Sequence, residues 1–221
     1  MKGQRKEPAC FIVGAGSFDG FLTEPQEGDL VIAADGGYAY LKRLGREPDV
    51  LMGDFDSLKE IPQRELIRHS PIKDDTDMAL AVAYARERGF RSFYLYGGLG
   101  GRLDHTLANL QLMTMLSREK LQCHMVGEGN VITAITEEKI CFPKSAAGMI
   151  SVFCAGEEAL GVTERGLKYT LSQARLTCER ALGVSNEFTG EESWIEVRKG
   201  TLILLWGAEN GLEGGRKDAE R

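Results

Sequence analysis

The sequence predicts an α/β protein in two parts: a mostly parallel sheet covered by helices, followed by an antiparallel β-rich region shaped as a sandwich or a barrel. Two observations predict this fold. Over the first 126 residues, short apolar runs alternate with segments of helical periodicity. After Gly127-Glu128-Gly129 the helical period disappears, and short β-rich runs follow one another closely.

The first part contains apolar runs of strand length and two clear helical segments. One helix is predicted over Asp77–Arg88, because Thr76 or Asp75 can cap its N-terminus and Gly89 can end it. A second helix is predicted over His105–Arg118. The strands are predicted at Cys10–Val13, Leu30–Ala34, Val50–Met52, Ser92–Tyr96 and Gln122–Val126.

The second part contains only strand-like runs, and its last residues are polar and rich in glycine. We therefore place a domain boundary near residue 128. This gives an α/β domain over 1–127, a β domain over 128–207 and a disordered tail over 208–221. The β domain strands are predicted at Val131–Thr136, Met149–Cys154, Leu160–Thr163, Trp194–Val197 and Thr201–Trp206.

Composition excludes several classes of partner. A formal net charge of −6 over 221 residues gives no basic footprint for nucleic acid. No apolar run approaches the roughly 20 residues of a membrane span, and the start of the chain lacks the apolar stretch of a secretory signal. The five cysteines form no CxxC pair and are expected to be reduced. We expect a cytoplasmic protein that binds neither nucleic acid nor membrane.

Carboxylates recur where predicted strands end. Asp35 follows the second strand, Asp54 and Asp56 follow the third, and Asp77 opens a helix. Open α/β sheets bind their ligands at this edge. Asp54 and Asp56 are separated by one residue, so in an extended segment both side chains project the same way and can approach one Mg²⁺ ion. The alternative is that Asp56 and Ser57 cap a helix over LKEIPQRELI.

A second acidic cluster, Lys73-Asp74-Asp75-Thr76-Asp77, precedes the first predicted helix. Capping alone does not need three aspartates. Two carboxylates about 5 Å apart repel by roughly 3 kcal/mol at an effective dielectric constant of about 20, which is large for a marginally stable domain. Since a bound divalent cation removes this repulsion, the cluster favours a metal site.

A glycine-rich segment, GGLGGRLDH at 97–105, joins a predicted strand to a helix. Glycines permit close approach of the backbone to a ligand, and amides at such a turn can hold phosphate oxygens. Arg102 adds a charged fork that lysine does not replace. The alternative is a merely flexible loop. The sequence has no GxxxxGK[ST] motif, which excludes Walker-type kinases, so a triphosphate would be held by metal, glycine-rich turns and Arg102.

Taken together, these segments resemble the thiamine pyrophosphokinase family. The motifs occur in a fixed order: ADGG at 34–37, PDVLMGDFDSL at 48–58, DDTDMALA at 74–81 and GGLGGRLDHTLANL at 97–110. GLKYTL at 166–171 and GVSNEFTG at 183–190 resemble the β-sandwich domain of that family. The resemblance implies a Rossmann-like domain that binds ATP and magnesium, followed by an antiparallel β-sandwich domain that binds thiamine.

The resemblance also implies an activity, transfer of the pyrophosphoryl group of ATP to the hydroxyl of thiamine, which gives thiamine diphosphate and AMP. Mg²⁺ is the implied cofactor, ATP and thiamine are the substrates, and the β domain completes the thiamine site, usually across a homodimer. The candidate aromatic residues for thiamine are Phe188 and Trp194.

Carried over residue by residue, the resemblance implies a set of site residues. The metal ligands are Asp54, Asp56 and Asp77. The catalytic residues are Asp54, Asp77, Arg102 and Asp104, with Asp104 or Asp77 as the acceptor of the hydroxyl proton. His105 is an alternative base, or a packing residue at a helix start. The substrate-binding residues are Asp35, Gly36, Lys73, Thr76, Gly98, Arg102, Asp104, His105, Asn109, Ser185 and Asn186.

Three other functions are considered. A phosphotransferase of the haloacid dehalogenase type would use Asp54 as its nucleophile, although Leu58 stands where that motif has Thr or Val. An NAD-dependent oxidoreductase would use Gly14-Ala15-Gly16 and Asp35, although the next glycine, Gly20, comes one position late. A non-catalytic module would sense nucleotide or thiamine without turnover, and the intact aspartates argue against it.

Overall fold

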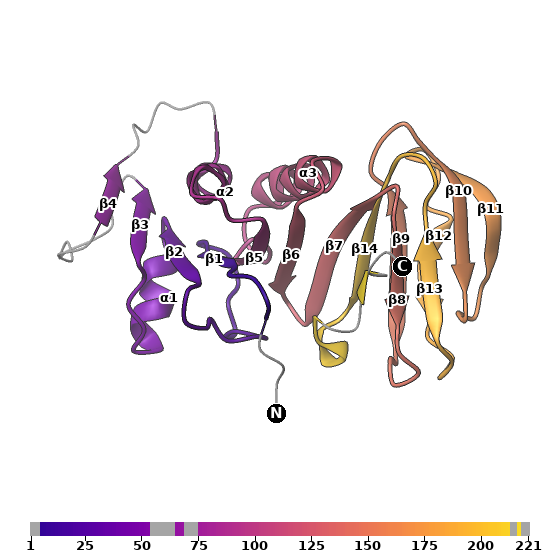
Figure 1. Ribbon diagram of the computed structural model, residues 1–221, viewed down its shortest axis with the longest axis horizontal. Coiled ribbons are helices and arrows are strands. Elements are labelled where there is room, and N and C mark those ends of the chain that lie inside the picture. Colours follow the sequence, from indigo (N-terminus) through magenta and orange to yellow (C-terminus); the bar gives the residue numbers. More distant parts are fainter. Residues whose placement is uncertain (1–4, 54–64, 69–74, 213–215, 218–221) are drawn as a thin grey trace. The chain divides into compact units, whose positions relative to one another are not determined.

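The computed structural model describes residues 5–53, 65–68, 75–212 and 216–217 (Figure 1). The chain divides into two compact units. The first holds residues 1–112 and 121–128, and the second holds residues 113–120 and 129–221. Compared with the predicted domains, this division assigns residues 113–120, at the end of a helix, to the β-rich unit.

The first unit is a parallel sheet whose strands are connected by helices (Figure 1). The described strands pair in the order β6-β5-β1-β2-β3-β4, and each pairing is parallel. The mostly parallel sheet predicted from the sequence is therefore confirmed. The elements are β1 (Cys10–Val13), β2 (Leu30–Ala34), α1 (Gly37–Arg43), β3 (Val50–Gly53), β4 (Glu65–Arg68), α2 (Asp77–Glu87), β5 (Ser92–Tyr96), α3 (Leu103–Arg118) and β6 (Gln122–Gly127).

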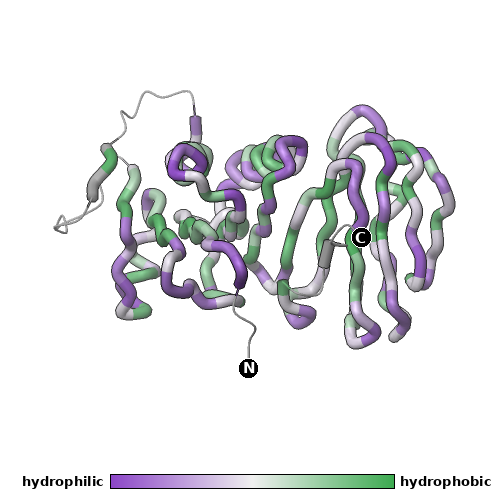
Figure 2. Tube along the Cα trace, viewed as in Figure 1, coloured by the Kyte–Doolittle hydropathy of each residue, from purple (hydrophilic) through white to green (hydrophobic). Residues whose placement is uncertain are grey.

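Burial explains why these strands are continuous apolar runs. Every residue of β1 and β3 is buried, as expected for strands covered on both faces. The helix α1 packs against β1 and β2, and α2 packs against β1, β2 and β3. In Figure 2 hydrophobic residues follow the strands. The charged residues of α2 stand at its two ends, and its buried residues are Met78, Ala81, Val82, Tyr84 and Ala85.

The helices begin and end where local chemistry allows. Thr76 is the N-cap of α2, and its hydroxyl accepts a hydrogen bond of 3.2 Å from the amide of Ala79. Gly89, with φ of 88°, follows the end of that helix. The helix α3 begins at Leu103, two residues before the predicted start, so Asp104 lies in its first turn. The helix alternative for LKEIPQRELI is wrong for residues 65–67, which belong to β4.

The strand order creates a crevice at the carboxyl ends of the central strands. The strands β1 and β5 are neighbours, yet the chain runs from β1 outward to β2 and from β5 outward to β6. The loops that follow β1 and β5 therefore leave the sheet in opposite directions, which opens a crevice of the kind in which open parallel sheets bind ligands. Gly14–Gly16 and Gly97–Arg102 form these two loops.

The second unit consists of two antiparallel sheets (Figure 1). The strands of one pair in the order β12-β9-β14-β7, and those of the other in the order β11-β10-β13-β8-β15. The antiparallel β region predicted from the sequence is confirmed, as two sheets. The elements are β7 (Asn130–Thr136), β8 (Lys139–Phe142), β9 (Met149–Cys154), β10 (Glu158–Arg165), β11 (Leu171–Thr177), β12 (Gly183–Glu187), β13 (Ser193–Glu196), β14 (Thr201–Gly207), η1 (Ala208–Asn210) and β15 (Arg216–Lys217).

Aromatic and hydroxyl contacts hold this unit together. The ring of Phe142 on β8 meets the ring of Trp206 on β14 edge-on, with centroids 5.4 Å apart, so the two sheets pack face to face. The end of α3 is fixed by buried hydroxyls, because Thr136 lies 2.9 Å from both Ser117 and Thr201. Arg118 donates a longer hydrogen bond of 3.5 Å to Thr201.

The structure differs from the predicted disordered tail at residues 208–212. Trp206 donates its indole N–H to the carbonyl of Gly211 at 3.1 Å. The side chain of Asn210 both accepts from the amide of Ala147 and donates to its carbonyl, each at 2.9 Å. These bonds order a short segment that shows no helical or strand periodicity in the sequence. No helix in the described ranges is long and apolar enough to span a bilayer.

Candidate active site

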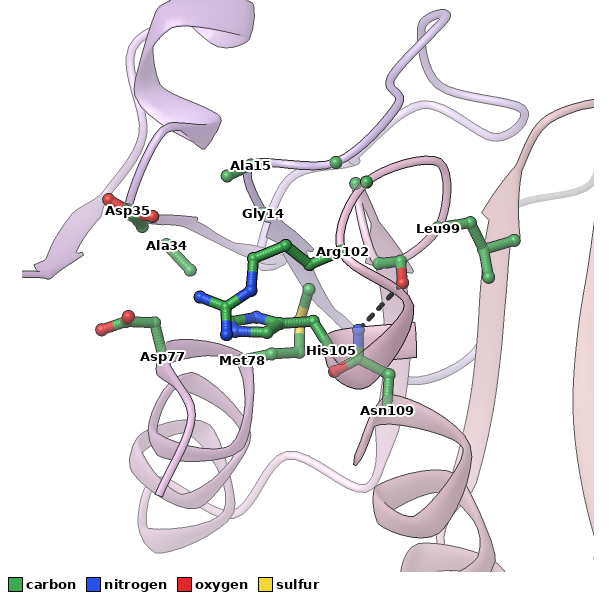
Figure 3. Close-up of a pocket in the computed structure, with 14 residues that line it drawn as sticks. Gly14, Ala15, Ala34, Asp35, Asp77, Met78, Leu99, Arg102, His105 and Asn109 are labelled. Atoms are coloured by element: carbon green, nitrogen blue, oxygen red, sulfur yellow. Dashed lines mark hydrogen bonds between the residues drawn. The ribbon is translucent and has the colours of Figure 1, made fainter. Parts of the chain in front are cut away.

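A pocket of about 290 Å³ lies at the carboxyl ends of β1, β2 and β5 (Figure 3). Its walls come from the loops that follow these strands and from the first turns of α2 and α3. This is the crevice that the strand order predicts. The lining residues are Gly14, Ala15, Gly16, Ala34, Asp35, Asp77, Met78, Gly97, Gly98, Leu99, Gly101, Arg102, His105 and Asn109.

The two glycine loops are bonded to each other through their backbones. Gly16 donates to the carbonyl of Gly97 at 2.8 Å, and Ser17 donates to the carbonyl of Leu99 at 2.7 Å. A Cβ atom on Gly16 would lie 2.2 Å from the oxygen of Leu99, and one on Gly97 would lie 2.3 Å from the oxygen of Gly14. Glycine is therefore required at both positions, because a side chain would push the loops apart.

The loop after β5 presents backbone amides that the protein does not use. Within the described ranges, the N–H groups of Gly98, Leu99, Gly100 and Gly101 donate no hydrogen bond to another group of the chain. Three of these residues line the pocket. Asn109, which is buried, donates to the carbonyl of Gly98 at 3.0 Å and fixes the loop (Figure 3). A fixed loop with unused amides can bind the oxygens of an anion.

Two carboxylates face the pocket from different elements. Asp77 is the first residue of α2, directly after its N-cap. Asp35 follows β2 in the left-handed region with φ of 51°, and its amide donates to the carbonyl of Met52 at 2.7 Å. In Figure 3 both carboxylates lie on the same side of the pocket. A strained backbone that points a carboxylate into a pocket is typical of a functional residue.

Three predicted site residues lie outside the described residues: the metal ligands Asp54 and Asp56 and the substrate-binding residue Lys73. Gly53, the described residue before Asp54, lies against Asp35, because a Cβ atom on Gly53 would be 3.3 Å from the Cα of Asp35. Among the residues that the structure describes, no group of three His, Cys, Asp or Glu side chains could hold a metal ion. The oxygen donors of Asp35 and Asp77 are nevertheless of the type that Mg²⁺ prefers.

Arg102 and Asp104 form a forked ion pair at the start of α3. The guanidinium donates from Nη2 to Oδ2 at 2.6 Å and from Nε to Oδ1 at 3.1 Å. The hydrogen bond from Arg102 lowers the pKa of Asp104, and the amide of His105 acts in the same direction. Arg102 reaches into the pocket toward the side where Asp35 and Asp77 lie (Figure 3). Asp104 is not a lining residue, and its two carboxylate oxygens hold the guanidinium of Arg102.

The pocket thus gathers Asp35, Asp77, Gly98, Arg102, His105 and Asn109 from the predicted substrate-binding and catalytic set. Gly36 and Thr76 lie next to it as the N-caps of α1 and α2. Sequence reasoning missed the lining residues Met78 and Leu99, which are apolar and carry no chemical signal.

Ser185 and Asn186 belong to the second unit, on β12. Asn186 is buried, whereas Ser185 is exposed with φ of 60°. The aromatic candidates are partly covered: Phe188 packs on Phe142 at 5.1 Å, and the ammonium of Lys139 lies 4.7 Å from the centre of the Trp194 ring.

Comparisons with known proteins identify relatives of both units. Residues 23–125 match the family model "Thiamin pyrophosphokinase, catalytic domain", and residues 137–202 match "Thiamin pyrophosphokinase, vitamin B1 binding domain". The thiamine pyrophosphokinase of Bacillus subtilis (strain 168) is 29% identical over 187 residues, which cover 81% of this chain and 87% of that protein. Thiamin pyrophosphokinase 1 of Caenorhabditis elegans is 24% identical over 172 residues, which cover 72% of this chain and 70% of that protein.

Solved structures agree. The crystal structure of thiamine pyrophosphokinase from Bacillus subtilis has a TM-score of 0.79 and 25% identity, and the match covers 90% of this chain and 98% of that one. The structure of thiamin pyrophosphokinase from Geobacillus thermodenitrificans has a TM-score of 0.77 and 26% identity, with coverage of 90% and 97%.

Proposed function

The chain belongs to the thiamin pyrophosphokinase family, and from this premise we propose that it transfers the pyrophosphoryl group of ATP to the hydroxyl of thiamine, giving thiamine diphosphate and AMP. It is an ATP-dependent transferase of thiamine diphosphate biosynthesis. The observation that carries this function is the succession of both domains of the family, catalytic and vitamin B1 binding, along one chain.

The loop after β5 suits the phosphates of ATP. Its unused amides at Gly98–Gly101 can donate to phosphate oxygens, and the guanidinium of Arg102 adds a fork of charged donors. The loop after β1 does not offer the same donors, because the amides of Gly14, Gly16 and Ser17 already bond to carbonyls of Tyr96, Gly97 and Leu99. This disfavours the dinucleotide-binding alternative, which needs a free amide turn after the first strand.

We further propose that Asp77, with Asp54 and Asp56, holds Mg²⁺ at the pocket, and that Asp35 belongs to the same cleft. Asp35 and Asp77 support this, because two carboxylates from separate elements lie on one side of the pocket. When bound, the ion would neutralise charge on the phosphate oxygens of ATP. The chain itself contributes positioning: the loop amides and Arg102 align the β-phosphorus for in-line attack by the thiamine hydroxyl.

The geometry favours Asp77 over Asp104 as the proton acceptor. A carboxylate whose pKa is lowered is a weaker base, and Asp104 is engaged in both hydrogen bonds of its fork with Arg102. Asp77 lines the pocket, whereas Asp104 does not. We therefore propose that Asp104 orients Arg102 and that Asp77 accepts the proton or binds the ion.

The second unit is proposed to bind thiamine through the surface near Ser185, inside the segment matched by the vitamin B1 binding model. Family resemblance supports a Rossmann-like first domain and a homodimer. The five cysteines, all described, form no disulfide, which suits the reducing cytoplasm.

Product analysis tests the proposal. The protein is incubated with ATP, Mg²⁺ and thiamine, and the nucleotide product is identified. AMP formed together with thiamine diphosphate supports the proposal. ADP would indicate single phosphoryl transfer, and the absence of any product together with binding of ATP or thiamine would indicate the sensing module.

A further inference from the structure

An acidic side chain lies inside the apolar core of the second unit. Glu164 on β10 is 1% exposed, and its cross-strand partner Ile195 and its neighbour Val162 are fully buried at 0%. Burial raises the pKa of the Glu164 carboxyl to about 7, although a hydrogen bond from Asn186 opposes the rise. An acid at such a position is costly for stability, which calls for a functional reason.

Glu164 accepts a hydrogen bond from Asn186, one of the predicted substrate-binding residues. Its Oε2 accepts from the side-chain amide of Asn186 at 2.8 Å. Its Oε1 is buried and has no hydrogen-bond partner within the described part of the chain. Both residues lie inside the segment that matches the vitamin B1 binding model, 137–202.

Asn186 has no hydrogen-bonding capacity left for a substrate. Its amide donates to Glu164 and also to the carbonyl of Tyr169 at 2.7 Å. Its carbonyl accepts from the amides of Tyr169 at 3.0 Å and Glu187 at 2.9 Å. Both hydrogens and both lone pairs of the side chain are used. Asn186 therefore acts on the site indirectly, by holding the backbone around it.

Exposed side chains stand on the two backbone segments that the Asn186 side chain joins. Tyr169 is 59% exposed, and Val184, next to the exposed Ser185, is 41% exposed. Lys168 is paired with Glu187 at 2.8 Å, which joins the same two segments a second time. The buried pair Glu164–Asn186 thus fixes the spacing between the segment at 168–169 and strand β12.

We propose that Glu164 is a positioning residue for thiamine: it orients the amide of Asn186, which holds the Tyr169 segment beside Ser185 in the arrangement that receives the substrate. This inference rests on the proposed function. Without the acceptor at Glu164, one hydrogen of the Asn186 amide is buried without a partner, and the side chain loses the constraint that decides its orientation.

Steady-state kinetics of the full chain test this role. Glu164→Leu removes the acceptor, and Glu164→Gln keeps an oxygen that accepts the same hydrogen bond. Glu158→Gln is the matched control, because Glu158 lies on the same strand but pairs with Arg175 in solvent. We expect Glu164→Leu to raise the KM for thiamine about tenfold, the effect of losing one buried hydrogen bond. The KM for ATP and the kcat of Glu164→Leu should stay within about twofold of the wild-type values. For Glu164→Gln and Glu158→Gln, kcat and both KM values should stay within the same range.

An unchanged KM for thiamine in folded Glu164→Leu, or an equal rise in both KM values, would overturn the proposal. If Glu164→Leu does not fold, Asn186→Asp places two carboxylates together, and the exchange Glu164→Gln with Asn186→Asp should lower the KM for thiamine again. If the KM for thiamine of the exchange is no lower than that of Asn186→Asp alone, the proposal is overturned.

If the wild-type chain forms no thiamine diphosphate, the proposed function has failed. The same variants are then compared by calorimetric binding of thiamine, and an unchanged Kd overturns the positioning role.

Discussion

Glu164→Gln should make the protein more stable at alkaline pH. The substitution removes the ionisable group but keeps the shape and the acceptor for Asn186. The pKa of Glu164 is raised in the folded state from its ordinary value of 4.5 to about 7. Because the folded state binds this proton more tightly than the unfolded chain does, the carboxyl costs nothing below pH 4.5. The cost grows as the pH rises toward about 7 and is complete above it.

The size of the effect follows from the shift in pKa. A rise from 4.5 to about 7, at about 1.4 kcal/mol per pKa unit, corresponds to a penalty of about 3 kcal/mol when the carboxyl is fully ionised. Between about pH 5 and about pH 8, this single group should lower the free energy of unfolding by roughly 2 to 3 kcal/mol. Solvent screens this charge only weakly, since Glu164 is 1% exposed.

Urea unfolding followed by tryptophan fluorescence measures the effect. The two tryptophans of the chain, Trp194 and Trp206, both lie in the second unit, so they report on the unit that contains Glu164. The free energies of wild type and Glu164→Gln should agree within about 1 kcal/mol near pH 5 and differ by about 3 kcal/mol near pH 8. Glu158→Gln, at an exposed site, should follow wild type. Parallel pH profiles for wild type and Glu164→Gln would refute the reasoning.

Further predictions concern the pocket. Asp77→Asn should lower kcat at least about a hundredfold without changing Tm, whereas Glu87→Gln at the exposed end of the same helix should leave both unchanged, as measured by product formation and thermal unfolding. Arg102→Lys should lower kcat about tenfold or more and leave the KM for thiamine unchanged in steady-state assays, because lysine cannot supply the fork. Gly16→Ala should cost about 1–3 kcal/mol in urea unfolding, because the new Cβ lies 2.2 Å from an oxygen of Leu99; Gly101→Ala, with 3.6 Å to its nearest atom, should cost less than about 1 kcal/mol.

The fold could be predicted where local signals agree with burial. The N-cap at Thr76 and the glycine at position 89 predict the bounds of α2 to within one residue. The predicted strands β1, β2 and β5 are confirmed, because buried parallel strands are continuously apolar. The helix α1 is not predicted from the sequence, because seven residues are too few to show a helical periodicity. The strand β11 was missed because most of its residues are not buried and it lacks a clean apolar alternation.

The site could be predicted only in part. The sequence places Asp35, Asp77 and Arg102 at strand and helix ends, and the topology then brings them to one pocket. Asn109 and Gly98 stand in the same motif, but the hydrogen bond by which Asn109 fixes the Gly98 loop joins residues eleven positions apart and becomes visible only in the structure. Glu164 was missed because its neighbours suggest an ordinary strand, and its cost becomes visible only once its burial is known.

A parallel sheet whose strand order reverses at its centre offers a crevice for either a dinucleotide or a metal-bound triphosphate, so the topology alone does not choose between them. The choice depends on which of the two glycine loops keeps its amides available. Here the amides of Gly16 and Ser17 donate hydrogen bonds to carbonyls of the loop after β5. That bonding holds the loop after β5 in place while its own amides at Gly98–Gly101 have no acceptor within the described ranges. The proposed anion site therefore follows the fifth strand, next to Arg102 and the start of α3. There a triphosphate would lie between the guanidinium and the carboxylates of Asp35 and Asp77.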